Sequence, residues 1–396
     1  MNPQTSKPRA LQAIRTVDSR QTGGPEELLL ASSPIMRARG QFDPAILLLR
    51  KPNPADPERD FSSRARNRNI PVLALPEMRW RPRWLRTLPG RLNVALVHVH
   101  GQRANYFVWL MRRLFPATWG RVPLVATVHG WVQDNFIRKV VTRLELLTLR
   151  ECDHIITVSE LQRRTLLEMG FSADRVSVVR PGIPDFAVGH KATMEERHNA
   201  RARWGIPQDA YVIAAIGRLS TEKRFDLYLQ VCADMAERLP EAVFLLVGGG
   251  KQEANLKELA ATLGLGERLI FTGLTREMPS VYAATDLVMI TSDTEGIPHV
   301  LLEAMGQGIP VVSTAVGGIP EIVTSGENGL LVPAGSLDEL ANAALRIHNE
   351  PGLGCRLAAG GYEVAGQFTV ERLVAGTEQV YKRVLEQRDA RSTRAR

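Results

Sequence analysis

Short, almost purely apolar runs, each long enough for one β-strand, alternate along this chain with longer amphipathic segments. Hydrophobicity that is continuous rather than alternating is typical of strands buried on both faces, and therefore of parallel strands joined by helical crossovers. In the first half the runs are Leu11–Val17, Ala45–Leu49, Val72–Leu75, Asn93–Val99, Pro123–Val128, His154–Val158 and Val176–Val179. In the second half they are Tyr211–Gly217, Ala242–Val247, Leu269–Thr272, Leu287–Ile290, Pro310–Ser313 and Gly329–Val332. This pattern predicts two doubly wound, Rossmann-like α/β domains built on parallel sheets.

Helical spacing of apolar residues predicts helices between the strands of the second half, at Phe225–Arg238, Gln252–Leu263, Val300–Gly306 and Ser336–Asn349. The domains are expected to meet in residues 186–207, a charged stretch without a strand. We therefore expect a first domain over residues 1–190 and a second over residues 191–370. A C-terminal helix over residues 371–396 is expected to pack back on the first domain and to end in a frayed basic tail. A cleft between the two domains is the expected ligand site.

The distribution of charge distinguishes the two halves of the chain. Of its 396 residues, 44% are hydrophobic and 23% charged, which excludes a fibrous or disordered chain. The formal charge of +8 is uneven, because residues 1–185 hold 29 Lys and Arg against 16 Asp and Glu, whereas residues 186–396 hold 21 against 26. The first half is therefore expected to meet something anionic: nucleic acid, a phospholipid surface or a phosphorylated substrate.

Cysteine usage and hydropathy indicate the compartment. Three cysteines, Cys152, Cys232 and Cys355, are scattered without a CxxC pair, which favours a reducing compartment over a disulfide framework. The N-terminal sequence lacks the apolar core of a signal peptide, and no run approaches the ~18 apolar residues that a membrane span needs. We expect a cytoplasmic protein, with or without peripheral contact at the inner face of the membrane.

Two carboxylates with the spacing E-x7-E give the strongest chemical signal. Glu295 follows the predicted strand Leu287–Ile290, and Glu303 lies in the first turns of a helix that begins near Pro298. The free N–H groups of such a helix start bind phosphate or sugar oxygens, and a carboxylate such as Glu303 can accept two hydrogen bonds from a vicinal diol such as a ribose. The alternative is that both carboxylates are simply solvated around a helix start.

Two cations on the loop after the strand Tyr211–Gly217 give the second signal. Arg218 and Lys223 suit a diphosphate, with arginine as a planar fork and lysine as a point charge. The alternative is a solvated pair of surface cations. The later run FLLVGGGK is a further transition from strand to glycine loop, but it lacks the spacing of the dinucleotide and P-loop fingerprints.

A series of segments in the second half resembles a known family. In order over about Tyr211–Leu345 they read GRLSTEKRFD, LLVGGG, FTGL, MPSVYAATDLVMITS, TEGIPHVLLEAM, GIPVVSTAVGGIPEIV and NGLLVPAGSLDELANAAL. They are similar to the retaining nucleotide-sugar glycosyltransferases of the GT-B fold, specifically family 4 (glycosyl transferases group 1). The first half resembles that family in the shorter pieces TGGPE, TVHG, CDHIITVS and VRPG. The segment PEELLLASS after Gly24 does not show the helix that is usual there.

The resemblance implies two domains facing a central cleft and a donor site in the second. Arg218 and Lys223 would bind the donor diphosphate and stabilise the leaving nucleotide. These two cations would take the place of the metal ion that other transferases hold with a DxD motif. Glu303 would hold the ribose, and Glu295 the hydroxyls of the donor sugar. The remaining expected donor contacts are Leu274, Ile297, Pro298, His299 and Val300, and no metal or cofactor is expected.

The resemblance also implies donor contacts from the first domain. Gly23 and Gly24 would let its glycine loop touch the diphosphate, and His129 would lie near the donor sugar. A histidine in that place can equally be structural. The implied reaction moves a sugar from a nucleoside diphosphate sugar to an acceptor hydroxyl with retention. A front-face displacement is the preferred mechanism, and a double displacement that uses Glu295 is the rival.

The acceptor is expected to bind mainly to the first domain. Arginines alternate with two tryptophans in Met78–Arg91, and the helix-like Tyr106–Phe115 adds an apolar face with two arginines. Such segments suit an anionic membrane surface. Members of the family with basic first domains often act on lipid-linked acceptors, so the resemblance implies a lipid-linked or polysaccharide-precursor glycan as the acceptor class. The alternative is that the tryptophans belong to the core and the arginines are solvated.

Two other functions remain open on sequence alone. The pI near 9.7 also fits a nucleic-acid-binding protein, but no RNP, zinc-finger or helix-turn-helix signature occurs, so no nucleic acid is expected. A nucleotide-sugar epimerase or a phosphorylase of the same fold is the alternative within enzymes. The combination of Arg218 and Lys223 with the E-x7-E pair favours transfer.

Overall fold

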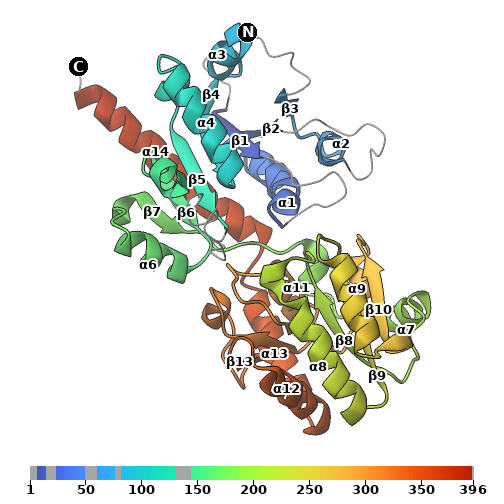
Figure 1. Ribbon diagram of the computed structural model, residues 1–396. Coiled ribbons are helices and arrows are strands. Elements are labelled where there is room, and N and C mark those ends of the chain that lie inside the picture. Colours follow the sequence, from blue (N-terminus) through green and yellow to red (C-terminus); the bar gives the residue numbers. More distant parts are fainter. Residues whose placement is uncertain (1–6, 15–23, 50–59, 76–81, 130–143, 395–396) are drawn as a thin grey trace. The chain divides into compact units, whose positions relative to one another are not determined.

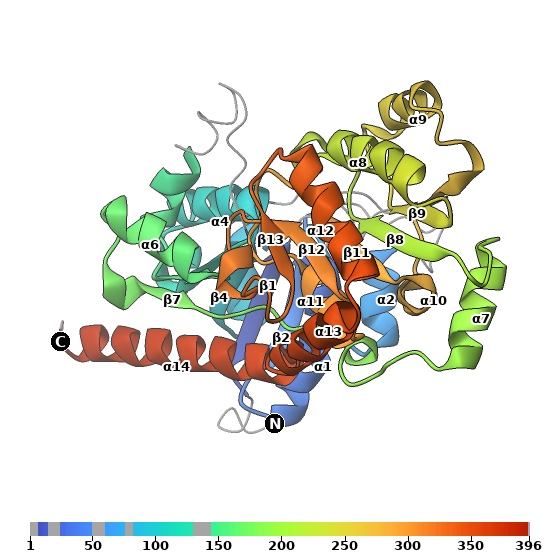
Figure 2. The same ribbon diagram turned by 90° about the horizontal axis from the view of Figure 1, so that it is seen from below.

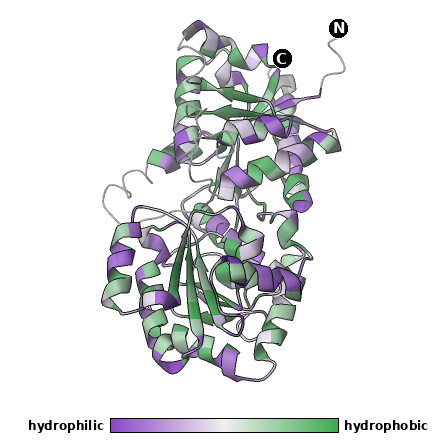
Figure 3. Cartoon of the chain, turned by 90° about the vertical axis from the view of Figure 1, so that its right-hand side faces the viewer, coloured by the Kyte–Doolittle hydropathy of each residue, from purple (hydrophilic) through white to green (hydrophobic). Residues whose placement is uncertain are grey.

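The computed structural model describes residues 7–14, 24–49, 60–75, 82–129 and 144–394. The chain divides into two compact units, of which unit 1 comprises Met1–Gly182 with Val370–Arg396 and unit 2 comprises Ile183–Thr369 (Figure 1). Each unit is a parallel sheet flanked by helices, so the predicted pair of α/β domains is confirmed. Both sheets are strongly apolar, while the helices carry apolar and polar residues (Figure 3).

The described residues of unit 1 form a seven-stranded sheet in the order β3-β2-β1-β4-β5-β6-β7. The strands are β1 (Arg9–Ile14), β2 (Asp43–Leu48), β3 (Val72–Ala74), β4 (Val94–His100), β5 (Leu124–Val128), β6 (His154–Thr157) and β7 (Val176–Val178). All neighbouring pairs are parallel. The strand order reverses between β1 and β4, which makes the carboxyl ends of these two strands the switch point of the sheet.

Helices cover both faces of this sheet. They are α1 (Gly24–Arg39), α2 (Phe61–Asn67), α3 (Pro82–Arg91), α4 (Gln102–Leu114), α6 (Glu160–Glu168) and α14 (Val370–Arg394), with further helical residues at 144–149. Buried side chains of α3, α4 and α6 share one core with the sheet. Those of α1, α2 and α14 pack on the opposite face, where α14 lies alongside α1 (Figure 2).

Unit 2 contains a six-stranded parallel sheet in the order β10-β9-β8-β11-β12-β13. The strands are β8 (Tyr211–Ile216), β9 (Ala242–Val247), β10 (Leu269–Gly273), β11 (Leu287–Ile290), β12 (Val311–Thr314) and β13 (Leu330–Val332). The helices are α7 (Met194–Arg203), α8 (Phe225–Arg238), α9 (Glu253–Thr262), α10 (Met278–Ala284), α11 (His299–Gly306), α12 (Leu337–Asn349) and α13 (Leu353–Ala365). Here the order reverses between β8 and β11.

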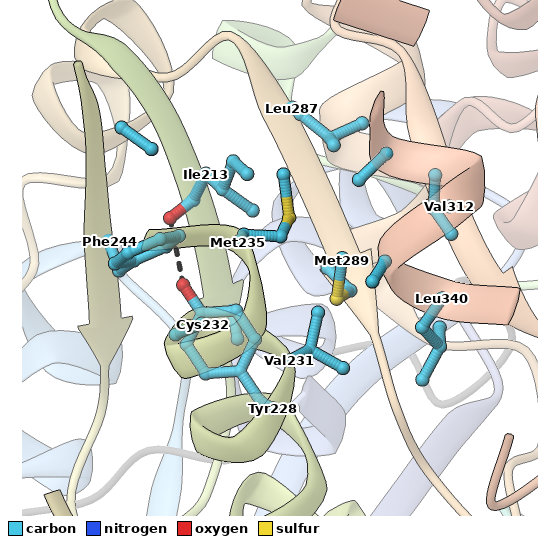
Figure 4. Packing of buried hydrophobic residues seen from close by; sticks show 14 of the residues in the cluster. Ile213, Tyr228, Val231, Cys232, Met235, Phe244, Leu287, Met289, Val312 and Leu340 are labelled. Atoms are coloured by element: carbon cyan, nitrogen blue, oxygen red, sulfur yellow. Dashed lines mark hydrogen bonds between the residues drawn. The ribbon is translucent and has the colours of Figure 1, made fainter. Parts of the chain in front are cut away.

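The larger core of unit 2 lies between this sheet and helices α8 and α12 (Figure 4). Tyr228 of α8 is fully buried, and its hydroxyl donates to the carbonyl oxygens of Ile213 (2.8 Å) and Leu245 (3.1 Å). Burying an aromatic or large aliphatic side chain contributes ~1.5–3 kcal/mol, and satisfying the buried hydroxyl avoids the cost of an unpaired donor. These bonds fix the register of α8 on β8 and β9, and thereby the loop that precedes α8.

The chain passes between units earlier than residue 190, the boundary expected from the charged stretch. Ile183 and Ala187 are buried in unit 2 against α11, and Gln307 donates to the carbonyl oxygen of Phe186. Apolar packing of a strandless segment thus decides the boundary, which the charge pattern does not reveal. The chain returns to unit 1 at Val370, where α14 begins.

The structure differs from the sequence-based expectation in two segments. The segment that follows Gly24 is helical, because Leu29, Leu30 and Met36 of α1 bury one face against the sheet. Of Met78–Arg91, the structure describes residues 82–91, which form α3. Trp84 is partly buried there and packs against the core, in agreement with the alternative that the tryptophans of this segment belong to the core. Among the described residues, no helix is both long and apolar enough to cross a membrane.

Candidate functional site

The two chemical signals of the second half follow neighbouring strands of the unit 2 sheet. The loop with Arg218 and Lys223 leaves the carboxyl end of β8, and the loop with Glu295 leaves that of β11. Strands β8 and β11 are hydrogen-bonded neighbours on either side of the point where the strand order reverses. Open α/β sheets bind ligands outside the carboxyl ends of their strands at this switch point. The structure therefore brings together residues that the sequence separates by about seventy positions.

The side chains of Lys223 and Glu295 meet directly. Lys223 Nζ lies 2.6 Å from Glu295 Oε1, and Ser292 Oγ donates to the same carboxylate oxygen at 2.6 Å. The side chains of Lys223 and Glu295 are 22% and 10% exposed, so the pair is shielded but remains open to a ligand. A charge-assisted bond of this kind is stronger than one between neutral groups.

Backbone contacts hold the Lys223 loop against the end of β11. Thr291 Oγ1 donates to the carbonyl oxygens of Lys223 (2.9 Å) and Arg224 (3.0 Å), and the N–H of Asp293 donates to the carbonyl of Glu222 (2.9 Å). Arg224 adopts a left-handed conformation with φ of 50°, which arginine rarely does without support from its surroundings. The loop is thus held at several points, so that Lys223 is preorganised.

Acidic side chains of the β11 loop are also engaged by cations. The guanidinium of Arg224 pairs with Asp293 (3.2 Å) and with Asp226 (3.1 Å). Within the described ranges, no group of three or more His, Cys, Asp or Glu side chains is arranged to hold a metal ion. Arg218, by contrast, is exposed and makes no side-chain hydrogen bond or ion pair with the described residues. Its guanidinium is therefore available to an anionic ligand.

Helix α11 begins next to the ion pair. Ile297 and Pro298 are buried, and Pro298 precedes the first helical residue, His299. Burial, with a smaller contribution from the charge of Lys223, lowers the pKa of His299 to about 4, so this imidazole is neutral near pH 7. Val300 is half-buried in the same first turn. The N-terminus carries partial positive charge from the helix dipole, which favours an anion or an oxygen acceptor there.

Glu303 lies inside α11 and is fixed by a tyrosine of the neighbouring helix α10. The hydroxyl of Tyr282 donates to Glu303 Oε2 at 2.7 Å. Burial and the nearby carboxylate raise the pKa of Tyr282 well above its usual value, so the phenol keeps its proton and acts as the donor. This bond orients the carboxylate and accounts for part of its hydrogen-bonding capacity.

Glycine loops bring the backbone after β8 and β9 into close contact. A Cβ atom at Gly248 would lie 1.9 Å from the carbonyl oxygen of Gly217, and one at Gly250 would lie 2.3 Å from that of Leu219. Gly249 faces Leu274, which follows β10 and is 44% exposed. The predicted Leu274 therefore stands beside the glycine run at the same edge of the sheet as Lys223.

Sequence reasoning missed five residues that shape this site. Gly317, after β12, has φ of 58°, and a Cβ atom there would lie 1.9 Å from the carbonyl oxygen of Glu295. The N–H of Gly318 donates to the carbonyl of Gly296 at 2.8 Å. The other missed residues are Tyr282, Thr291 and Ser292. The glycine pair in STAVGGIPE was a signal for Gly317, whereas the contacts of the others depend on tertiary packing.

The predicted site residues of the first half belong to unit 1. His129 directly follows β5, and its ring stacks on that of His100 with centroids 5.9 Å apart. Gly24 is the first described residue of α1. Gly23 lies outside the described residues, so its predicted contact stays a prediction.

Family comparisons cover both halves of the chain. The profile of Glycosyl transferases group 1 matches residues 196–364, and that of Glycosyltransferase Family 4 matches residues 23–185. A 2-deoxystreptamine glucosyltransferase from Streptomyces kanamyceticus is 31% identical, over 74% of this chain and 78% of that one. A D-inositol 3-phosphate glycosyltransferase from Salinispora arenicola is 31% identical, over 72% of this chain and 68% of that one.

Solved structures share the fold. Anabaena HepE in complex with UDP-glucose superposes with a TM-score of 0.79 at 23% identity, covering 94% of this chain and 99% of that one. Sucrose-phosphate synthase from Thermosynechococcus elongatus gives a TM-score of 0.77 at 21% identity, covering 96% of this chain and all of that one. The two parallel-sheet domains are therefore those of the GT-B fold. By its sequence relatives and its fold, the chain belongs to the group 1 glycosyl transferases of family 4 and is a glycosyltransferase.

Proposed function

We propose that this enzyme transfers a hexose from a nucleoside diphosphate sugar to an acceptor hydroxyl with retention of configuration and without a metal ion. The observation that carries the proposal is the contact of Lys223 with Glu295 at the switch point, beside the N-terminus of α11. It joins a cation suited to a diphosphate with a carboxylate suited to sugar hydroxyls. A relative named for glucosyl transfer and a structural neighbour solved with UDP-glucose support the choice of donor.

In the proposed site each residue contacts a particular part of the donor. Arg218 and Lys223 bind the diphosphate and stabilise the negative charge that develops on the leaving nucleotide. Glu303, oriented by Tyr282, binds the ribose hydroxyls. Glu295 and the start of α11 bind hydroxyls of the donor sugar or phosphate oxygens. His129 and the glycines at 23 and 24 are proposed to contact the donor from unit 1.

The proposed reaction is a front-face displacement. The bond between the anomeric carbon and the phosphate oxygen breaks, the bond from the acceptor oxygen to that carbon forms on the same face, and the acceptor proton passes to the leaving phosphate oxygen. Catalysis then comes from positioning and from stabilising the leaving group. In the rival double displacement, Glu295 attacks first. Its Oε1 atom already accepts bonds from Lys223 and Ser292, which makes it a weaker nucleophile and favours the front-face route.

The test is a transfer assay with UDP-glucose and an acceptor panel that includes D-inositol 3-phosphate and 2-deoxystreptamine, the compounds in the relatives' names. Release of UDP, matched by formation of an α-linked product in the NMR spectrum and unaffected by excess EDTA, is the expected result. A β-linked product contradicts retention, and loss of activity with EDTA contradicts metal independence. A product that is an epimerised donor or a sugar phosphate supports the epimerase or phosphorylase alternative.

We further propose that unit 1 works at an anionic, cytoplasmic membrane surface, where a lipid-linked acceptor is available. Arg83, Arg86 and Arg91 of α3 are exposed, and Leu110 and Leu114 of α4 are 45% and 57% exposed. Exposed arginines together with exposed apolar side chains on the same unit suit phospholipid headgroups. Co-sedimentation with phosphatidylserine vesicles but not with phosphatidylcholine vesicles is expected, and equal recovery with both contradicts the proposal.

A further inference from the structure

A line of polar side chains crosses the central strands of the unit 1 sheet. Gln12 of β1 pairs in register with His98 of β4, and His100 of β4 pairs in register with Thr127 of β5. Neighbours in register on parallel strands, and residues two apart on one strand, point to the same face of a sheet. All four side chains therefore lie on the face that packs against α14. Gln12 and His98 are buried there, where a polar group is costly unless it is hydrogen-bonded.

A tyrosine of the C-terminal helix supplies hydrogen-bond partners to these buried polar side chains. Tyr381 of α14 is fully buried, and its oxygen lies 2.7 Å from both Gln12 Nε2 and His98 Nδ1. His98 Nε2 lies 2.6 Å from Thr127 Oγ1, and His100 Nε2 lies 2.8 Å from Gln12 Oε1. The five side chains thus form one continuous hydrogen-bonded chain.

The amide of Gln12 sets the direction of every bond in the chain. Because Gln12 Nε2 donates to Tyr381, its Oε1 is the acceptor, and His100 Nε2 must carry a proton. Burial raises the pKa of Tyr381, so the phenol stays protonated and donates to His98 Nδ1. Burial also lowers the pKa of His100 well below its usual value, so that this imidazole is neutral. Its Nδ1 atom therefore carries a lone pair.

The lone pair of His100 has no hydrogen-bond partner in the part of the chain that the structure describes. His100 Nδ1 makes no hydrogen bond with the described residues and is not one of the buried polar atoms closed off from solvent. His100 is half-buried at the carboxyl end of β4, where β4 adjoins β1 at the switch point of this sheet. The ring of His129 lies beside it. A fixed, neutral acceptor atom is thus presented at the edge of the sheet where ligands bind.

We propose that His100 belongs to the acceptor site of the enzyme, where Nδ1 accepts a hydrogen bond from a hydroxyl of the sugar or polyol acceptor. Gln12 and Tyr381 are positioning residues that fix the tautomer of His100 from behind. This inference rests on the proposed function, because it assigns a contact to the acceptor of that reaction. It also gives α14 a role in acceptor binding, since its tyrosine lies at the other end of the bonds that orient His100.

Paired amide substitutions at His100 separate the two ring nitrogens. His100→Gln places an amide near the Nε2 position and keeps the bond to Gln12, whereas His100→Asn places an amide near Nδ1 and keeps the contact with the acceptor. We expect His100→Gln and His100→Ala to raise the acceptor KM about tenfold, the loss typical of one hydrogen bond, with an unchanged KM for UDP-glucose. His100→Asn should recover most of the acceptor affinity. The acceptor is whichever compound of the panel the wild type uses, and thermal unfolding verifies that each variant is folded.

A matched control and a spectroscopic readout complete the test. His154, at the amino end of β6, bonds Ser177 through Nε2, so His154→Gln makes the same substitution at the opposite edge of the sheet and should leave both KM values unchanged. The ¹⁵N NMR spectrum should show His100 protonated on Nε2 in the wild type, and Tyr381→Phe should reduce that preference. An unchanged acceptor KM in His100→Gln, or rescue by Gln rather than Asn, overturns this inference alone. A wild type that transfers glucose to no acceptor overturns the proposed function, and this inference with it.

Discussion

Lys223 Nζ and Glu295 Oε1 lie 2.6 Å apart and join the loops that follow β8 and β11. Each residue balances the charge of the other, so the site holds a cation and an anion in place before any donor is bound. A diphosphate that approaches Lys223 adds negative charge beside Glu295, and the exposed Arg218 supplies a further cation. The fold therefore supplies the free energy that orders the Lys223 side chain, and donor binding does not have to supply it.

Replacing Lys223 should slow the reaction more than it weakens donor binding. Lys223→Ala removes the charge that we propose stabilises the leaving nucleotide, and we expect kcat to fall about 10²- to 10³-fold, the usual loss for one electrostatic contact in a transition state. The KM for UDP-glucose should change by less than about tenfold, because the proposed contact of Arg218 with the diphosphate remains. Initial rates of UDP release over a range of UDP-glucose concentrations measure both values.

Lys257→Ala is the matched control for this substitution. Lys257 lies on the surface of α9 and pairs with Glu253 one turn away, and such an exposed pair contributes little. Its removal should leave kcat and KM as in the wild type. If Lys223→Ala retains wild-type kcat, the assignment of leaving-group stabilisation to Lys223 is wrong.

Glu303 should discriminate between ligands with and without ribose hydroxyls. In Glu303→Ala we expect binding of UDP to weaken by about tenfold or more, since a hydrogen bond to a charged group contributes ~1.5–3 kcal/mol. Tyr282→Phe should weaken it less, because the carboxylate remains but its orientation is lost. Calorimetry with UDP and with its 2′,3′-dideoxyribose analogue measures the effect. If both ligands lose equal affinity, Glu303 does not contact the ribose.

The strands of this protein and the loops of its candidate site could be predicted from local sequence. Runs such as Leu287–Ile290 are continuously apolar because both faces of a parallel strand are covered, and the structure has β11 at these residues. The predicted helix Phe225–Arg238 is also α8 without a shift. Switch-point topology then brings the ends of β8 and β11 together, so that Lys223 and Glu295 could be placed at one edge.

The supporting contacts could not be predicted because they join distant parts of the chain. Gln12 and Tyr381 are 369 positions apart, and nothing near either residue indicates that they meet. The helix that follows Gly24 was missed for a related reason. Its sequence is only weakly amphipathic, and packing of α14 along α1 stabilises a helix that local propensity does not specify.

Gly317→Ala should damage the site through the backbone of the Glu295 loop. A Cβ atom at Gly317 would lie 1.9 Å from the carbonyl oxygen of Glu295, so the loop must move before the variant can fold. We expect a lower Tm and at least a tenfold lower kcat. Gly335→Ala is the control. Gly335 also has a positive φ, of 78°, but nothing lies within 4 Å of a Cβ atom added there. That control carries only the conformational cost of ~1–2 kcal/mol and should keep its kcat. Equal effects of both substitutions would show that the contact with Glu295 is unimportant.

Stability of unit 1 should fall as the pH drops below about 6.5. Burial, with a smaller contribution from His129, lowers the pKa of His98 from the ordinary 6.5 to about 3. Between these values the unfolded chain binds a proton that the folded chain does not, so acid favours unfolding. From pH 6.5 to pH 5 this one histidine should remove about 2 kcal/mol of stability. Thermal unfolding of the wild type between pH 7.5 and pH 5 should show the corresponding fall in Tm.

Substitution of His98 isolates its share of this pH dependence. His98→Gln keeps an amide near Thr127 but cannot be protonated, so the variant should start from a lower Tm at pH 7.5 and lose less of it on acidification than the wild type. His198→Gln, at an exposed position of α7, replaces a histidine that solvent already surrounds and should follow the wild-type curve. Because the stabilising effect of a neutral buried imidazole is complete above pH 6.5, the curves of wild type and His98→Gln should run parallel there and converge below it. Curves that stay parallel down to pH 5 would mean that His98 takes up its proton without unfolding the enzyme, and that the hydrogen bonds to Tyr381 and Thr127 do not keep it neutral.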